Sequence, residues 1–192
     1  MTENKPEFIL IHCSDVSYKE MPNQFWAINR WHKEREFPVS SLGYYVGYHR
    51  LSSGGIEYKA REDREVGAHC NQIANGKSDS FNFYSLGYCL AFDGDIEYPP
   101  QKDVDNMIRT IRGWQQLYAI PLERVIFHRK PTPRKTCPGS LIPDDYFSRM
   151  LAPVPHKEPD QKEKQENIKR LSSILDQLRA LYERLMILLS KR

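Results

Sequence analysis

Short apolar runs that alternate with amphipathic segments most constrain the fold of this chain. Residues 8–11 (FILI), 85–92 (SLGYCLAF) and 124–127 (RVIF) have the length and composition of buried strands. Residues 23–36 and 102–120 space their apolar side chains as amphipathic helices do. Residues 43–51 and 56–60 flank a Ser-Ser-Gly-Gly turn, which predicts a hairpin. The alternation predicts an α/β fold in which helices flank a mixed central β-sheet.

The composition changes near the end of the chain and predicts a division into parts. A short helix is expected over residues 143–151, and the proline-rich, charged residues 153–160 are typical of a linker. From Ile168 to Leu189, apolar residues recur at alternating spacings of three and four, which is a heptad pattern. We therefore expect a domain over residues 1–152, a linker over 153–160 and a C-terminal amphipathic helix over 161–192.

The apolar stripe of this last helix requires a surface to cover it. Its regular heptad favours a homo-oligomer of two to four chains. A membrane surface is the alternative, because basic residues flank the final apolar run. A third reading, in which the helix folds back on its own domain, is allowed by the length of the linker.

Charge and composition argue against several classes of function. Nine of the 28 Lys/Arg and six of the 25 Asp/Glu residues lie in residues 156–192, so residues 1–155 hold nineteen of each. A neutral main domain lacks the basic stripe that nucleic-acid binding needs. The four cysteines form no CxxC pair, which argues against a structural zinc ribbon. The N-terminus has no secretory signal, which predicts synthesis in the cytoplasm.

Three candidate metal ligands follow predicted strands. His12 ends the first strand, His128 follows the last strand, and Cys137 lies in the loop after it, and the ends of strands are where an α/β sheet exposes side chains to a cleft. Two imidazoles and one thiolate suit Zn²⁺ and leave a fourth coordination position open, as in catalytic zinc sites. The spacing alone does not single out this triple, because the chain has six His and four Cys.

Five ordered motifs carry a resemblance to a known family. FILIHCSD, SLGYYVGYHR, REVGAHC, YSLGYCLAFDGD and FHRKPTPRKTCPG, within residues 6–151, resemble those of the type 2 N-acetylmuramoyl-L-alanine amidases, which include phage endolysins and the related peptidoglycan recognition proteins. The resemblance implies that His12, His128 and Cys137 hold a zinc ion. It also implies catalytic roles for Tyr44, in a Gly-Tyr motif, and for Lys135, and contact with substrate for His69.

The chain departs from the family pattern at two positions. The family commonly has His after the Gly-Tyr pair, where Tyr45 follows Tyr44 here. Cytoplasmic recycling amidases have Glu in the strand where this chain has Cys89, and no other carboxylate base is evident. Of the other His and Cys residues, we expect Cys13, Cys70 and Cys89 to be buried, His32 to be exposed and His49 to be core or rim.

The resemblance implies zinc-dependent hydrolysis of the amide bond between N-acetylmuramic acid and L-alanine in peptidoglycan. A catalytic zinc lowers the pKa of its bound water to about 7 and polarises the scissile carbonyl. The absence of the recycling-type Glu favours an endolysin-type enzyme that reaches the cell wall after holin-type release. A non-catalytic peptidoglycan-binding protein and a cytoplasmic muropeptide-recycling amidase are the alternatives.

Overall fold

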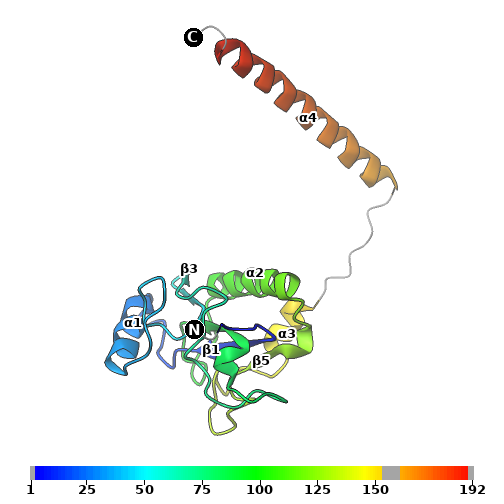
Figure 1. The fold of residues 1–192 in the computed structure, drawn as a ribbon. Coiled ribbons are helices and arrows are strands. Elements are labelled where there is room, and N and C mark those ends of the chain that lie inside the picture. The colour runs from blue at the N-terminus through cyan, green and yellow to red at the C-terminus, as the bar shows by residue number, and fades with distance from the viewer. Residues whose placement is uncertain (1–2, 153–160, 190–192) are drawn as a thin grey trace. The chain divides into compact units, whose positions relative to one another are not determined.

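The computed structural model describes residues 3–152 and 161–189 (Figure 1). Five strands form one mixed sheet. The sheet order is β3-β2-β4-β1-β5. Strands β2, β4, β1 and β5 are parallel to one another, and the edge strand β3 is antiparallel to β2. The predicted fold class is confirmed. The strands are β1 (Phe8–Cys13), β2 (Arg50–Ser53), β3 (Ile56–Lys59), β4 (Ser85–Leu90) and β5 (Val125–Phe127).

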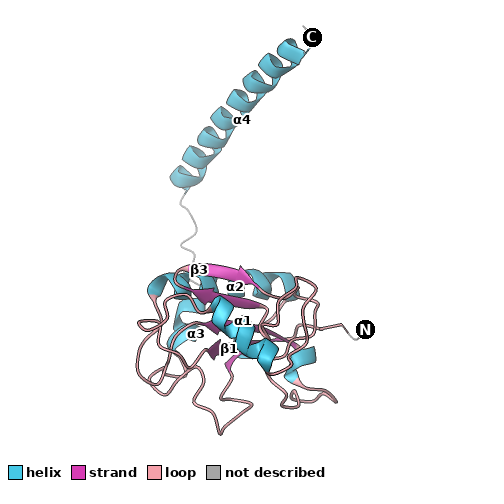
Figure 2. Ribbon diagram, turned by 90° about the vertical axis from the view of Figure 1, so that its left-hand side faces the viewer, coloured by secondary structure: helices cyan, strands magenta, loops and turns pink. Residues whose placement is uncertain are grey.

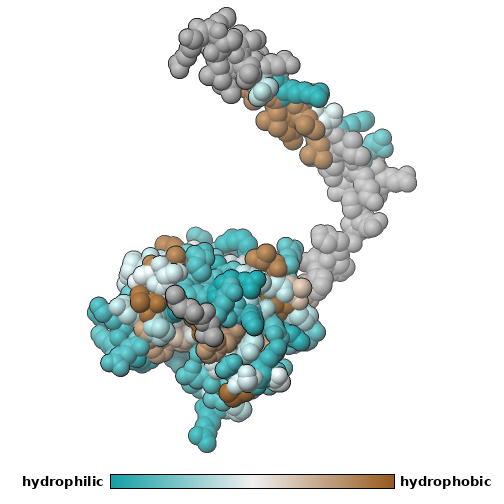
Figure 3. Space-filling model, viewed as in Figure 1, coloured by the Kyte–Doolittle hydropathy of each residue, from teal (hydrophilic) through white to brown (hydrophobic). Residues whose placement is uncertain are grey.

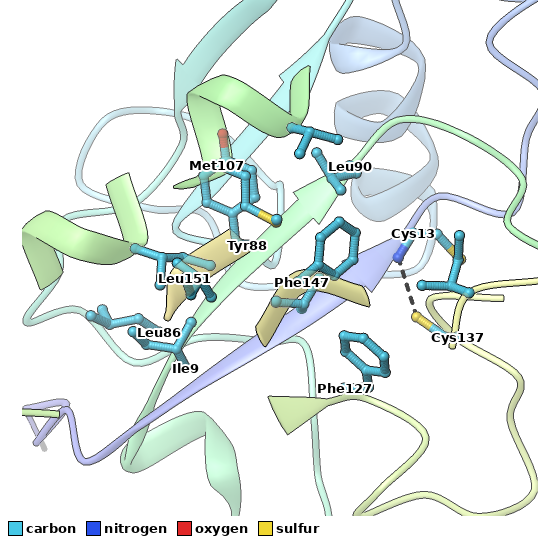
Figure 4. Close-up of a cluster of buried hydrophobic side chains, with 14 of the residues drawn as sticks. Ile9, Cys13, Leu86, Tyr88, Leu90, Met107, Phe127, Cys137, Phe147 and Leu151 are labelled. Carbon is cyan, nitrogen blue, oxygen red and sulfur yellow. Dashed lines mark hydrogen bonds between the residues drawn. The ribbon is translucent and has the colours of Figure 1, made fainter. Parts of the chain in front are cut away.

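The central strands carry apolar side chains on both faces of the sheet, so both faces must be covered. Ile9 and Ile11 of β1 join α2 (Gln101–Tyr118) and α3 (Tyr146–Leu151) in one buried cluster (Figure 4). Leu10 points to the opposite face, where it packs with Ile126 of β5. His12 has the same parity as Leu10, so it lies on the face opposite α2.

The first helix belongs to the other face of the sheet. Phe25 and Ile28 of α1 (Phe25–Glu34) pack against Leu51 of β2 and Cys89 of β4. Short 3₁₀ turns, η1 (Phe81–Phe83) and η2 (Leu122–Arg124), precede β4 and β5. Long loops make up much of the rest of this unit (Figure 2), and several of them form the cavity described below.

The predicted hairpin is present, but its first strand begins at Arg50 instead of residue 43. Residues 40–44 form a turn, in which the Ser40 N–H donates to the Tyr44 carbonyl at 2.7 Å and the Gly43 N–H donates to the Ser40 carbonyl. Gly43 has a φ of 84°, which interrupts an extended conformation. The strands β2 and β3 are joined at Gly54 and Gly55, both with positive φ, as a two-residue hairpin turn requires.

The chain divides into two units, residues 1–152 and 153–192. The second contains α4 (Gln161–Leu189). The predicted linker, residues 153–160, and the last three residues of the predicted helix lie outside the described residues. Within the described part of the chain, no helix is both long and apolar enough to span a bilayer.

Candidate metal centre and its cavity

Two of the predicted ligands are brought together by the register of neighbouring strands. In the parallel pair β1 and β5, Ile11 lies opposite Phe127, and the His128 N–H continues the ladder by donating to the Ile11 carbonyl at 3.1 Å. His12, near the end of β1, and His128, directly after β5, therefore lie at the same edge of the sheet, with ring centroids 4.3 Å apart.

The third ligand returns to this edge through a loop that is held by backbone contacts. The Arg129 N–H donates to the Cys137 carbonyl at 2.8 Å, and the Arg129 guanidinium donates to the carbonyls of Gly139 (2.8 Å) and Ile142 (2.7 Å). Gly94 packs directly on this loop, because a Cβ there would lie 1.8 Å from the Pro138 carbonyl oxygen. These contacts fix where Cys137 presents its sulfur.

Ligand atoms of His12, His128 and Cys137 all lie within 4.8 Å of one another, and the three residues are buried. The Cys137 Sγ lies 4.0 Å from Nδ1 of His12 and accepts the Cys13 backbone N–H at 3.2 Å (Figure 4). Two imidazoles and one thiolate are a donor set that Zn²⁺ binds in catalytic sites. The structure thus brings the predicted triple together as a group that could hold a metal ion.

In the metal-free chain, the protonation states of His12 and Cys137 fit this donor set, whereas His128 must lose a proton before it can bind a metal. The hydrogen-bonding contact with the Cys13 side chain lowers the pKa of Cys137 well below its usual value, against the opposing effect of burial, and this favours the thiolate form. Burial and the neighbouring His128 lower the pKa of His12 to about 4, which keeps this imidazole neutral. Burial also lowers the pKa of His128, but hydrogen bonds with Cys137 and Cys70 outweigh it and raise that pKa to about 9.

The triple lines a cavity of about 690 Å³. Its charged lining is mostly basic, with Arg35, Arg134 and Lys135 as cations and Asp15 as the carboxylate. Asp15 has a φ of 57°, a conformation that non-glycine residues seldom adopt outside turns and functional sites. Sequence reasoning found no carboxylate for the site; the position of Asp15, three residues after His12, could have indicated one.

Tyr44 is not among the residues that line this cavity. Its ring packs against Phe25 and Trp26 of α1, because the turn over residues 40–44 carries it there. Tyr48 lines the cavity instead, with its ring centroid 5.0 Å from that of His12. The chain has a second Gly-Tyr pair, Gly47-Tyr48, which is followed by His49. Because the resembled family commonly has His after its Gly-Tyr pair, His49 could have indicated that Tyr48, and not Tyr44, matches the family tyrosine.

The other predicted site residues lie at the cavity. Lys135 lines it with an exposed side chain. His69 also lines it, and its Nδ1 lies 3.1 Å from Nε2 of His12. Burial, with the nearby His12, lowers the pKa of His69 well below its usual value.

His32 is a correction to the sequence analysis. It was expected to be exposed but is buried, and its Nδ1 accepts the Gly47 N–H at 3.1 Å. The physical reason is its place on α1, four residues after Ile28 on the buried face of that helix.

Several solved structures share this fold. The N-acetylmuramoyl-L-alanine amidase LysC from Clostridium intestinale is 23% identical, with a TM-score of 0.59 over 77% of this chain and 86% of that one. Bumblebee PGRP-SA is 18% identical, with a TM-score of 0.60 over 81% and 89% of the two chains. Drosophila PGRP-LB is 24% identical, with a TM-score of 0.56 over 80% and 83%. At these identities the likeness establishes the fold.

The family follows from the sequence itself. The family model described as N-acetylmuramoyl-L-alanine amidase matches residues 2–140, most of the chain, whereas no curated protein matches it. The chain therefore belongs to the N-acetylmuramoyl-L-alanine amidase family.

Proposed function

We propose that the protein is a zinc-dependent hydrolase of the amide bond between the lactyl group of N-acetylmuramic acid and the L-alanine of the stem peptide. The observation that carries the proposal is the buried group of His12, His128 and Cys137 in the wall of an open, mostly basic cavity. A zinc ion bound there would supply a Lewis acid and activate water at neutral pH.

The side chains around this group have separate tasks in the proposed reaction. The Cys13 N–H donates to the Cys137 sulfur and favours its thiolate form. The pKa of Tyr48 is raised well above its usual value by burial, so its phenol stays protonated and can donate a hydrogen bond. Tyr48 and Lys135 would stabilise the negative charge that develops on the substrate carbonyl oxygen.

The charges of the cavity support a substrate that carries carboxylates. Arg35 and Arg134 lie in its wall beside Lys135, and Asp15 offsets only one of these charges. A peptidoglycan stem peptide has free carboxylates along its backbone and side chains, and basic side chains would orient them. We propose the cell wall as the site of action, in the manner of an endolysin.

Purified protein tests this function in one experiment. We expect about one zinc per chain by metal analysis and release of intact stem peptides from purified cell walls, with new N-terminal alanine. Chelation should abolish the release, and added zinc should restore it. Binding to cell walls without hydrolysis by the zinc-loaded protein would instead establish a non-catalytic peptidoglycan-binding protein. Hydrolysis of soluble muropeptides but not of walls would establish a recycling amidase.

We also propose that α4 associates with copies of itself. Its described apolar side chains are each more than half exposed in the single chain, and they follow helical spacing (Figure 3). They are Leu171, Ile174, Leu175, Leu178, Leu181 and Tyr182. A stripe of this length is typical of helices that pair with one another.

A further inference from the structure

His69 contacts the candidate metal ligand His12 and is not itself a member of the His12, His128 and Cys137 group. The Nδ1 atom of His69 lies 3.1 Å from Nε2 of His12, with the two rings nearly perpendicular at 87°. On the other side of the His12 ring, Nδ1 lies 4.0 Å from the Cys137 sulfur. The two nitrogens of His12 therefore face different partners, Nδ1 toward the ligand group and Nε2 toward His69.

The protons of this pair can be assigned from the coordination chemistry. A histidine that binds a metal through Nδ1 must carry its proton on Nε2. Nε2 of His12 is then the donor, and Nδ1 of His69 must be the acceptor. The single proton of a neutral His69 is thereby placed on its own Nε2.

The surroundings of His69 hold its ring in the accepting orientation. A Cβ at Gly67 would lie 2.5 Å from Cδ2 of the ring, and one at Gly87 would lie 2.8 Å from the same atom. The backbone of His69 is fixed as well, because its N–H donates to Oδ1 of Asn82 at 2.8 Å. The ring thus fits between two glycines that leave space for it.

The second nitrogen of His69 is enclosed by the same two glycines. Nε2 is buried, has no hydrogen-bond partner among the described residues, and lies within 3 Å of a Cβ position at both Gly67 and Gly87. One ring nitrogen therefore faces His12 and the other faces backbone. Neither is available to hydrogen-bond with a substrate in the cavity.

We propose that His69 is a positioning residue that accepts the His12 Nε2–H and so presents His12 Nδ1 to the metal. This inference rests on the proposed function and deepens it. It assigns His69 a contact to the metal-binding residue His12 in place of a contact to substrate. Partners of metal-binding histidines fix the tautomer and the ring orientation, and their loss weakens metal binding about 10–100-fold.

Three variants test the acceptor. His69→Ala removes it, and zinc affinity, measured by competition with a chromogenic chelator, should fall about 10–100-fold. His69→Asn keeps an oxygen near the position of Nδ1 and should restore most of that affinity. Gly67→Ala keeps the imidazole but displaces its ring, and it should weaken zinc binding in the same direction. His32→Ala removes a buried imidazole that does not hydrogen-bond with His12, and it should leave zinc affinity unchanged.

Kinetics of His69→Ala and NMR of the wild-type protein distinguish a positioning role of His69 from a substrate contact. At saturating zinc, His69→Ala should keep KM within about twofold, since only a substrate contact would raise it. Nitrogen-15 NMR of the zinc-loaded wild type should show His12 protonated at Nε2, a result that does not depend on any variant folding. Unchanged zinc affinity in His69→Ala, or a proton on Nδ1 of His12, overturns the positioning role while leaving the zinc enzyme intact. A wild type that binds no zinc overturns both.

Discussion

Tyr48 lines the cavity from the segment just before β2. Its ring lies beside His12, whereas Tyr44, four residues earlier, packs on α1. We expect Tyr48→Phe to bind zinc normally and to lower kcat by about 100-fold or more, the usual effect of losing one donor to a developing oxyanion. Tyr44→Phe is the matched control and should keep kcat within about twofold. Steady-state kinetics on a soluble muropeptide measure both, and the reverse order would return the catalytic role to Tyr44.

At the scale of elements, the loop after β5 positions a ligand through one arginine. Arg129 bonds to the carbonyls of Gly139 and Ile142 and to the Asp144 carboxylate. Arg129→Ala should therefore loosen the segment that carries Cys137 and weaken zinc binding about tenfold. Arg149→Ala is the control, because this exposed arginine of α3 pairs locally with Asp145, the residue just before the helix. Equal zinc affinities in the two variants would show that the loop keeps its shape without Arg129.

The strands that carry the ligands could be predicted from the sequence because both are buried. A strand buried on both faces is a continuous apolar run in the sequence. One such run ends at Ile11, directly before His12, and another ends at Phe127, directly before His128. The cavity residues between the elements could not be predicted in this way. Residues 43–49 contain two Gly-Tyr pairs, and only the turn at Gly43 decides which tyrosine reaches the cavity. His32 was mistaken for a surface residue because its charged neighbours lie on the opposite side of the same helix.

For the whole molecule, buried neutral histidines make stability depend on pH. Burial lowers the pKa of His49 from 6.5 to about 4, and its Nδ1 accepts the Gly87 N–H at 3.0 Å. As the pH falls, His49 therefore binds a proton at a higher pH in the unfolded chain than in the folded chain. The stabilisation from this group is complete above pH 6.5 and is lost as the pH falls from 6.5 toward 4.

The expected change is measurable by urea unfolding of zinc-free protein. At about pH 4.5, His49 alone should have cost on the order of 2–3 kcal/mol of the unfolding free energy measured at about pH 7.5. His49→Gln, which does not titrate, should be less stable at the higher pH but should lose less on acidification. The same pH dependence in the variant as in the wild type would show that other groups cause the loss.

The apolar stripe of α4 determines the expected state of the whole molecule in solution. Residues such as Leu171, Leu175 and Leu178 are each about 60% exposed in the single chain, and water contact along this stripe is unfavourable. We expect light scattering to show two to four chains per particle for residues 1–192 and single chains for residues 1–152. The shorter protein should still hydrolyse soluble muropeptides, because all three candidate ligands lie within it.

A charge variant distinguishes association from binding to lipid. Leu175→Glu places a carboxylate within the stripe and should convert the full chain to monomers, whereas Asp176→Glu, one residue later, keeps its charge and should not. A full chain that is monomeric in solution and floats with vesicles of anionic phospholipid would contradict self-association and establish a membrane surface as the partner. A full chain that is monomeric and does not bind vesicles would indicate that residues 1–152 cover the stripe. In that case α4 would be protected from proteolysis only when residues 1–152 are present.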